Sequence, residues 1–87
     1  MDMFENDEEA YLNWVFSHPN GFVINTPKSG RGYPNMLHRA TCIHITTAHK
    51  NYTTTIYKKA CSMNRQELVN SYKDAANGFA GCRHCKP

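Results

Sequence analysis

Apolar positions near the start of the chain follow helical spacing. The stripe falls at i, i+1, i+4 and i+5 and consists of Tyr11, Leu12, Val15 and Phe16. This spacing predicts an amphipathic helix. Asn6 or Asp7 can cap it, and the acids of its first turn suit the positive end of the helix dipole. Turn residues over 18–21 predict its end.

A second helix is predicted in the last third of the chain. Asn64, followed three residues later by Glu67, matches a capping box. The apolar residues of one helical face come next: Leu68, Val69, Tyr72 and Ala76. Gly78 predicts the stop of this helix, because glycine readily adopts the left-handed conformation that ends helices.

The residues between the helices predict three strands, at 22–24, 36–45 and 52–60. The last is rich in threonine, tyrosine and isoleucine, which have high β propensity. Glycines and basic residues over 27–34 predict a flexible loop, and we expect a hairpin turn between the last two strands. The expected fold over 1–87 is a single small zinc-stabilised α+β domain with an N-terminal helix, a three-stranded antiparallel sheet, a second helix and a C-terminal CxxC knuckle.

Charge is unevenly distributed along the chain. Five of the seven acids lie in residues 1–9, and we expect this acidic segment to be frayed. Residues 10–87 carry all ten Lys and Arg residues against Glu67 and Asp74, so the net charge of +3 becomes +8 for this part. A positive excess of this kind is typical of a nucleic-acid-binding surface.

The chain has no apolar run of roughly 18 residues or more, and its start lacks the basic and apolar regions of a signal peptide. This pattern argues against a membrane protein and favours a cytoplasmic one. A chain of 87 residues has a small core and often depends on a metal or disulfides. In a reducing compartment, the four cysteines are expected to be metal ligands or buried thiols.

Two cysteines near the end of the chain form the strongest local motif. Cys82-Arg83-His84-Cys85 is a CxxC, whose two thiolates can bind one zinc ion in a tight turn. Zinc needs two more nitrogen or sulfur ligands, and His38 and Cys42 offer them at a four-residue spacing that can converge where a strand ends. The two pairs together predict a closed Cys₃His site.

Other residues compete for this role. Cys61 can replace a ligand, although a small residue between a strand and a helix is more typical of the core. His44 shares a face with His38 and Cys42 in a regular strand, whereas a bend at Cys42 places it on the surface. His84 is a weaker candidate. A redox CxxC and a metal-free disulfide framework are the other interpretations, but no helix follows the motif and no secretion signal precedes it.

These motifs resemble the Ada-type metal-binding domain over residues 36–87. The resemblance is carried by His38-Arg39-Ala40-Thr41-Cys42, a helix led by Ser62, and Gly78-Phe79 before Cys82-Arg83-His84-Cys85-Lys86-Pro87. The segments Tyr11-Leu12-Asn13-Trp14 and Gly21-Phe22-Val23-Ile24-Asn25 are similar to N-terminal modules of bacterial HNH-endonuclease-like proteins.

The resemblance implies one zinc ion held by His38, Cys42, Cys82 and Cys85. In the Ada protein, one thiolate of this set accepts a methyl group from a DNA phosphotriester. The matching residue is His38, whose imidazole has no anionic sulfur to attack with. The resemblance therefore implies the scaffold and the metal rather than methyl transfer.

The sequence predicts a non-catalytic zinc module that binds nucleic acid, DNA in preference to RNA, as an accessory domain of a larger protein. The expected basic contacts are Lys28, Arg31, Arg39, Lys58, Lys59, Arg83 and Lys86, with Tyr33, Tyr52 and Tyr57 available to stack on bases. The alternative is a docking module for a protein or another domain of the same chain, anchored by Trp14, Phe16 and Phe79. Catalysis is not expected, because no carboxylate lies in an obvious motif and four ligands leave zinc no open position.

Overall fold

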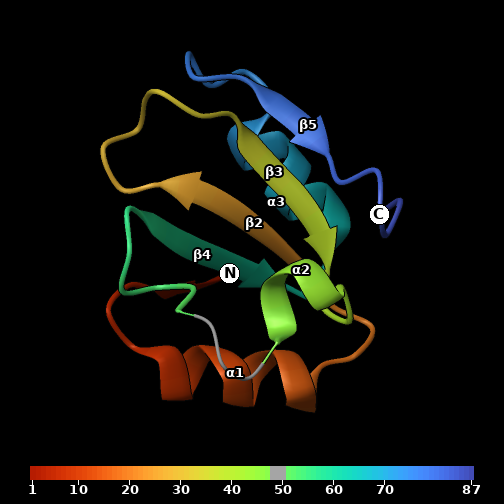
Figure 1. The fold of residues 1–87 in the computed structure, drawn as a ribbon. Helices are drawn as coiled ribbons and strands as arrows, with labels where there is room; N and C mark the ends of the chain where they lie inside the picture. Colours follow the sequence, from red (N-terminus) through yellow and green to blue (C-terminus); the bar gives the residue numbers. More distant parts are fainter. Residues whose placement is uncertain (48–50) are drawn as a thin grey trace.

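A computed structural model describes residues 1–47 and 51–87 and shows an α+β fold (Figure 1). The elements are, in chain order, β1 (Asp2–Phe4), α1 (Glu8–Ser17), β2 (Phe22–Pro27), β3 (Asn35–Arg39), α2 (Ile43–Thr46), β4 (Tyr57–Ser62), α3 (Arg65–Tyr72) and β5 (Phe79–Gly81). The two longer helices lie on opposite sides of one sheet, with α1 on one side and α3 on the other.

The sheet has five strands in the order β1-β4-β2-β3-β5. β4, β2 and β3 pair antiparallel at the centre, β1 adds antiparallel to β4, and β5 adds parallel to β3. The α+β class is confirmed, but the expected three-stranded antiparallel sheet is wrong, because both edges carry a further three-residue strand. The expectation of a frayed segment 1–9 is also wrong over Asp2–Phe4, where β1 pairs with β4.

Both long helices begin at the predicted caps. The Asp7 carboxylate accepts a hydrogen bond from the Ala10 backbone N–H, and the Asn64 side chain accepts one from the Glu67 backbone N–H. These bonds satisfy first-turn donors that have no partner inside the helix. α3 ends at Tyr72 rather than at residue 76. Gly78 has a left-handed φ of 97° but lies in the turn beyond the helix.

Two predicted strands have different bounds in the structure. The strand expected over 36–45 ends at Arg39, because the backbone turns at Cys42 and enters the short helix α2. The strand expected over 52–60 begins only at Tyr57 and continues to Ser62. The predicted turn between them falls partly on residues 48–50, which lie outside the described residues.

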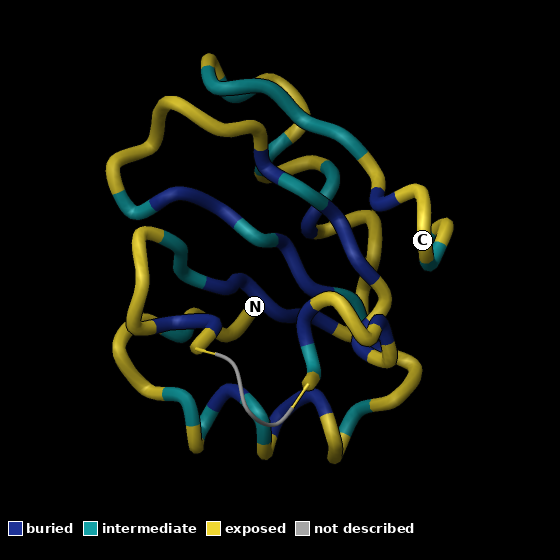
Figure 2. Tube along the Cα trace, viewed as in Figure 1, coloured by how far each residue is buried: buried dark blue, intermediate teal, exposed yellow. Residues whose placement is uncertain are grey.

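Alternation along the strands divides the core into two clusters. Figure 2 shows that buried residues follow the central strands of the sheet. Ile24, Leu37 and Ala60 pack with Leu68 of α3 on one face. Their strand neighbours Val23 and Cys61 point to the other face, which α1 covers with Tyr11, Trp14 and Val15. Because side chains alternate between faces with a period of two, His38 also points to the α1 face. The α1 face is therefore the one that holds the candidate metal ligands.

Candidate metal centre

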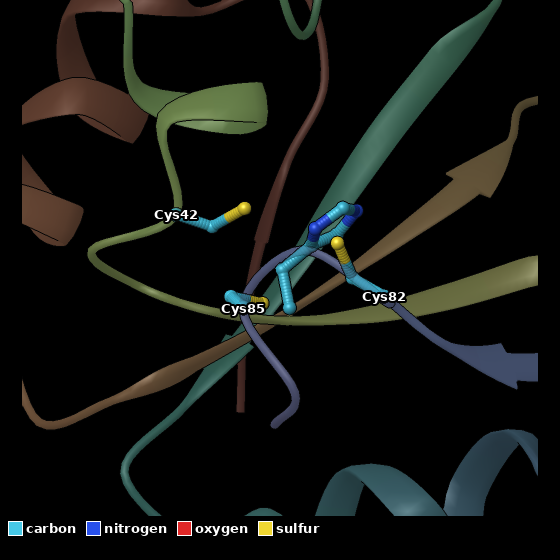
Figure 3. Close-up of side chains that lie close together, drawn as sticks. Cys42, Cys82 and Cys85 are labelled. Carbon is cyan, nitrogen blue, oxygen red and sulfur yellow. The ribbon is translucent and has the colours of Figure 1, made fainter.

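Four side chains meet at one end of the sheet: His38, Cys42, Cys82 and Cys85. One ligand atom from each lies within 4.8 Å of the other three. Figure 3 shows the three cysteine side chains gathered at one point, Cys42 from the segment that precedes α2 and the other two from the end of the chain. The four residues are positioned to hold a metal ion, and they are the set that the sequence predicts.

Local backbone geometry brings the two pairs together. His38 lies near the end of β3, and the chain then turns so that the Cys42 N–H donates to the Arg39 carbonyl at 3.0 Å. Cys82 follows β5, and its N–H donates to the Leu37 carbonyl at 2.8 Å, one residue before His38. A second turn follows, closed by a 3.0 Å bond from the Lys86 N–H to the Cys82 carbonyl. Parallel pairing of β3 with β5 is therefore what places the CxxC beside His38.

The ring of His38 fits a metal ligand. Only 6% of the residue is exposed, and its buried Nδ1 has no hydrogen-bond partner among the described residues. An unpaired polar atom in the interior is costly unless something else satisfies it. Burial, helped by the charges of Lys59 and His44, lowers the pKa of His38 to about 4, so its imidazole is neutral at physiological pH. The neutral ring is the form that binds metals.

The cysteines have the surroundings of metal thiolates. The Cys85 sulfur accepts a hydrogen bond from the Arg39 backbone N–H at 3.2 Å. Burial favours the neutral thiol of Cys82, but the backbone N–H groups of Cys85 and His84 donate to its sulfur and lower its pKa overall. Burial raises the pKa of Cys42 to about 12 when no cation is nearby. A bound cation supplies the positive charge that a thiolate in this position needs. The set of one nitrogen and three sulfurs is compatible with tetrahedral zinc.

The Arg39 side chain forms hydrogen bonds that hold the CxxC turn against β3. Its Nε donates to the Cys85 carbonyl and its guanidinium nitrogen to the Lys86 carbonyl, both at 3.0 Å. Together with the backbone bond to the Cys85 sulfur, these contacts join β3 to the second half of the CxxC turn. Arg39 is exposed, so its expected contact with nucleic acid stays a prediction, but its guanidinium already has two partners within the domain.

The competing ligands lie elsewhere. Cys61 is fully buried among the residues under α1, and burial raises the pKa of its thiol to about 12. His44 lies on α2 beyond the bend at Cys42, where its exposed ring stacks on that of His84 with centroids 4.4 Å apart. The prediction of Cys61 as a core residue is confirmed, and the bend that places His44 on the surface is observed.

Substituting the cysteines one at a time separates these roles. We expect Cys61→Ser to keep one equivalent of metal and to lose about 1–3 kcal/mol of stability, because a hydroxyl replaces a thiol in an apolar site. Cys42→Ser is expected to lose the metal. Metal content by mass spectrometry and unfolding by denaturant measure the two effects. Loss of metal from Cys61→Ser alone would contradict the ligand set.

The basic residues predicted to contact nucleic acid differ in how exposed their side chains are. Lys28 and Arg31 line an open hollow of about 400 Å³ together with the exposed Tyr33. Lys58 is half-buried on β4, and Arg83 and Lys86 are exposed at the knuckle. These five side chains remain available to a partner in whole or in part.

Lys59 and Tyr52 do not belong to an exposed basic surface. Lys59 is 2% exposed, and its ammonium donates to the Asn25 side-chain oxygen and to the Tyr52 carbonyl. Burial lowers the pKa of Lys59 to about 8. Tyr52 is 6% exposed, and its hydroxyl accepts a bond from the Thr47 N–H. Lys59 and Tyr52 are therefore buried, and neither side chain offers a contact on the exposed outer surface of the domain.

The three aromatic residues predicted to anchor a docking partner also differ in exposure. Trp14 is 9% exposed and its indole N–H donates to the Asp2 carboxylate, so its role is internal. Phe79 is half-buried and packs against the core cluster under α3. Phe16 is 62% exposed and is the one of the three that remains available to a partner.

The sequence interpretation missed Asn25, which pairs with Lys59 across β2 and β4. A signal was present: Lys59 and Cys61 are two residues apart on a strand, so a buried Cys61 implies that Lys59 points to the same face. A buried lysine needs acceptors, and the position opposite it on the neighbouring strand is Asn25.

Comparisons with family models, curated proteins and solved structures give no match to this chain. No helix among residues 1–47 and 51–87 is long and apolar enough to cross a membrane. The assignment of function therefore depends on the geometry of the chain itself.

Proposed function

We propose that this domain is a non-catalytic, zinc-stabilised module that binds nucleic acid through a basic surface, as an accessory part of a larger bacterial cytoplasmic protein. The hollow lined by Lys28, Arg31 and Tyr33 carries this proposal. DNA is the favoured target because of the resemblance to the Ada-type domain. That resemblance also favours zinc as the metal.

Zinc suits both the donor set and the burial of the site. Three sulfurs and one imidazole nitrogen complete a tetrahedral shell, which is the usual composition of structural zinc sites. Cys42 and Cys82 are at most 7% exposed, so little room is left for a water molecule or a substrate on the metal. A closed shell of this kind stabilises a fold and supplies no open position for catalysis.

The basic surface has the chemistry that a nucleic acid needs. Among the described residues, no Lys or Arg side chain forms a salt bridge with a carboxylate, since the single ion pair joins the N-terminal amine to Glu67. Lys28 and Arg31 can therefore neutralise phosphates. Tyr33, 52% exposed and 5.7 Å from the ring of Tyr57, offers a flat face for an unpaired base. The exposed Arg83 and Lys86 can extend the contact at the knuckle.

Salt dependence tests the proposal directly. We expect the affinity for single-stranded DNA to fall steeply between about 50 and 200 mM salt, because bound counterions are released from the phosphates. Lys28→Ala and Arg31→Ala should each reduce the slope of log K against log salt by about 0.7. Tyr33→Ala should weaken binding by about 1–3 kcal/mol with little change in slope. Fluorescence anisotropy of labelled oligonucleotides measures all three, and duplex DNA and RNA are compared in parallel.

Lys73→Ala is the matched control, because Lys73 is also an exposed lysine but lies at the end of α3, outside the hollow. The slope of log K against log salt for Lys73→Ala should equal that of the unmodified protein. If none of the nucleic acids shifts an amide resonance at low salt, the proposal is wrong.

The second candidate function is docking of a protein or of another domain. Exposed Phe16 favours it, because this ring lines a hollow of about 230 Å³ with Val15, Pro19, Ala40, Thr41 and Thr46. Apolar docking is nearly insensitive to salt, so binding that depends on Phe16 and does not change with ionic strength would favour this function instead.

A further inference from the structure

A second hollow lies beside the metal centre and has a buried lysine in its wall. Its volume is about 200 Å³, and its lining includes His38, Lys59 and Lys59's partner Asn25. Thr55 lines both this hollow and the basic hollow of Lys28 and Arg31, so the two are neighbours. We name the smaller one the Lys59 hollow.

The ammonium of Lys59 has donor capacity to spare. It carries three N–H groups, and within the described residues it has two acceptors, the Asn25 side-chain oxygen and the Tyr52 carbonyl. No carboxylate among these residues forms a salt bridge with it, although burial, which lowers the pKa of Lys59, is partly offset by the charge of the Glu8 carboxylate, which acts from farther away and raises that pKa. Instead, the rings of Tyr11, Tyr52 and Tyr57 surround it with centroids 5.6–5.9 Å from Nζ. A buried cation without an ionic partner is costly, and an anion would remove that cost.

The rest of the lining also favours an anion. The Asn25 oxygen accepts from Lys59, so its amide N–H₂ group is left as a donor. Thr55 and Tyr57 contribute hydroxyl side chains, and Asn51 contributes a second amide. Among residues 1–47 and 51–87, no Asp or Glu lines the hollow. The wall therefore combines one cation with several neutral donors, which is the chemistry of oxyanion recognition.

We propose that the Lys59 hollow binds a small oxyanion of the phosphate class, with Lys59 as its anchor and Asn25 as a second donor. Lys59 is 2% exposed, so an anion must enter the hollow to reach it. An internal phosphodiester carries a sugar on both sides and suits an open groove. A free phosphate or the terminal phosphate of a strand has one unencumbered side and suits a hollow of about 200 Å³.

The test is a titration of the metal-loaded protein with inorganic phosphate, free of excess metal, followed by NMR. We expect saturable shifts of the Asn25 side-chain amide and of the backbone amides of Tyr57 and Lys59. Lys59→Met should reduce the affinity for phosphate by about tenfold or more, since it removes a charge-assisted hydrogen bond. Lys58→Met is the control at the adjacent residue, which does not line the hollow, and should change the affinity by less than about twofold.

If Lys59→Met fails to fold, the variant Asn25→Asp tests the same site. This substitution preserves shape, gives Lys59 a carboxylate partner and should abolish phosphate binding. Asn70→Asp adds the same charge on α3, across the sheet, where the side chain accepts a bond from Gln66 that a carboxylate also accepts. It should leave the affinity unchanged.

A 5′-phosphorylated oligonucleotide and its 5′-hydroxyl counterpart distinguish the two sources of the anion. Tighter binding of the phosphorylated strand, lost in Asn25→Asp, would identify a terminal phosphate; equal binding with a phosphate titration that saturates would identify a free oxyanion. Either result supports the site. Shifts confined to Lys28 and Arg31, or phosphate affinity unaffected by both Lys59→Met and Asn25→Asp, would overturn the proposal.

Discussion

Removal of the metal is expected to unfold the domain. Structural zinc in small domains is worth about 10–16 kcal/mol of apparent binding free energy, which exceeds the total stability of most domains of this size. The physical reason here is that two of the candidate ligands also belong to the core, because Cys42 and Cys82 pack in the same cluster as Tyr11 and Val23. Without a cation, the buried His38 Nδ1 has no partner among the described residues, and only hydrogen bonds join Cys82 and Cys85 to β3.

Circular dichroism and NMR spectra recorded during chelation measure this effect. Addition of one equivalent of Zn²⁺ should restore the native spectrum, whereas Mg²⁺ should not, because it prefers oxygen ligands. A native spectrum and unchanged melting temperature in protein shown to be metal-free would contradict a structural role for the site.

Glu8→Gln is expected to destabilise the domain strongly although it changes no core residue and no candidate metal ligand. The Glu8 carboxylate accepts hydrogen bonds from the backbone N–H groups of Tyr52, Thr53 and Thr54 and from the Thr53 hydroxyl, so it joins α1 to the segment before β4. Hydrogen bonds to a charged group contribute about 1.5–3 kcal/mol each, and the amide retains part of the set. We expect a loss of about 3 kcal/mol in the free energy of unfolding at neutral pH.

The pH dependence of this loss has a definite sign. Burial alone would raise the pKa of Glu8, but the hydrogen bonds from residues 52–54 outweigh it and lower the pKa below the ordinary 4.5. A lowered pKa in the folded state contributes stability that is complete above about pH 4.5 and is lost as the pH falls below it. The difference between the unmodified protein and Glu8→Gln should therefore shrink in that range.

Glu9→Gln is the control for both measurements. Glu9 lies in the same first turn of α1 and has the same relation to the helix dipole, but it is exposed. Its substitution should cost less than about 0.5 kcal/mol. Equal effects of the two substitutions would show that the helix dipole, and not the bonds to residues 52–54, explains the role of Glu8.

The parts of the fold that could be predicted are those encoded by neighbouring residues. Asp7 and Asn64 begin helices because their side chains reach N–H groups three residues ahead. The ligand set was also predictable, because His38 and Cys42, like Cys82 and Cys85, are close in sequence and can converge on one ion.

The remainder depends on partners distant in sequence. β1 and β5 are three residues long, and neither has a periodic pattern; each is a strand because β4 or β3 offers it an open edge. Lys59 has the composition of a surface residue and is buried because the sheet places Asn25 and three tyrosine rings around it. The capping box is likewise half-formed, since the Glu67 carboxylate pairs with the N-terminal amine.

The short strands at both edges of the sheet have a consequence for aggregation. Exposed strand edges are templates for pairing between molecules, and proteins limit this hazard by keeping edge strands short. Here β1 and β5 cover the longer β4 and β3. Because β5 is followed directly by Cys82, a metal ion held by the four candidate ligands would also keep β5 in place. If β5 detaches in the metal-free protein, the edge of β3 at Asn35, Met36 and Leu37 is uncovered, and we expect that protein to self-associate as the concentration rises.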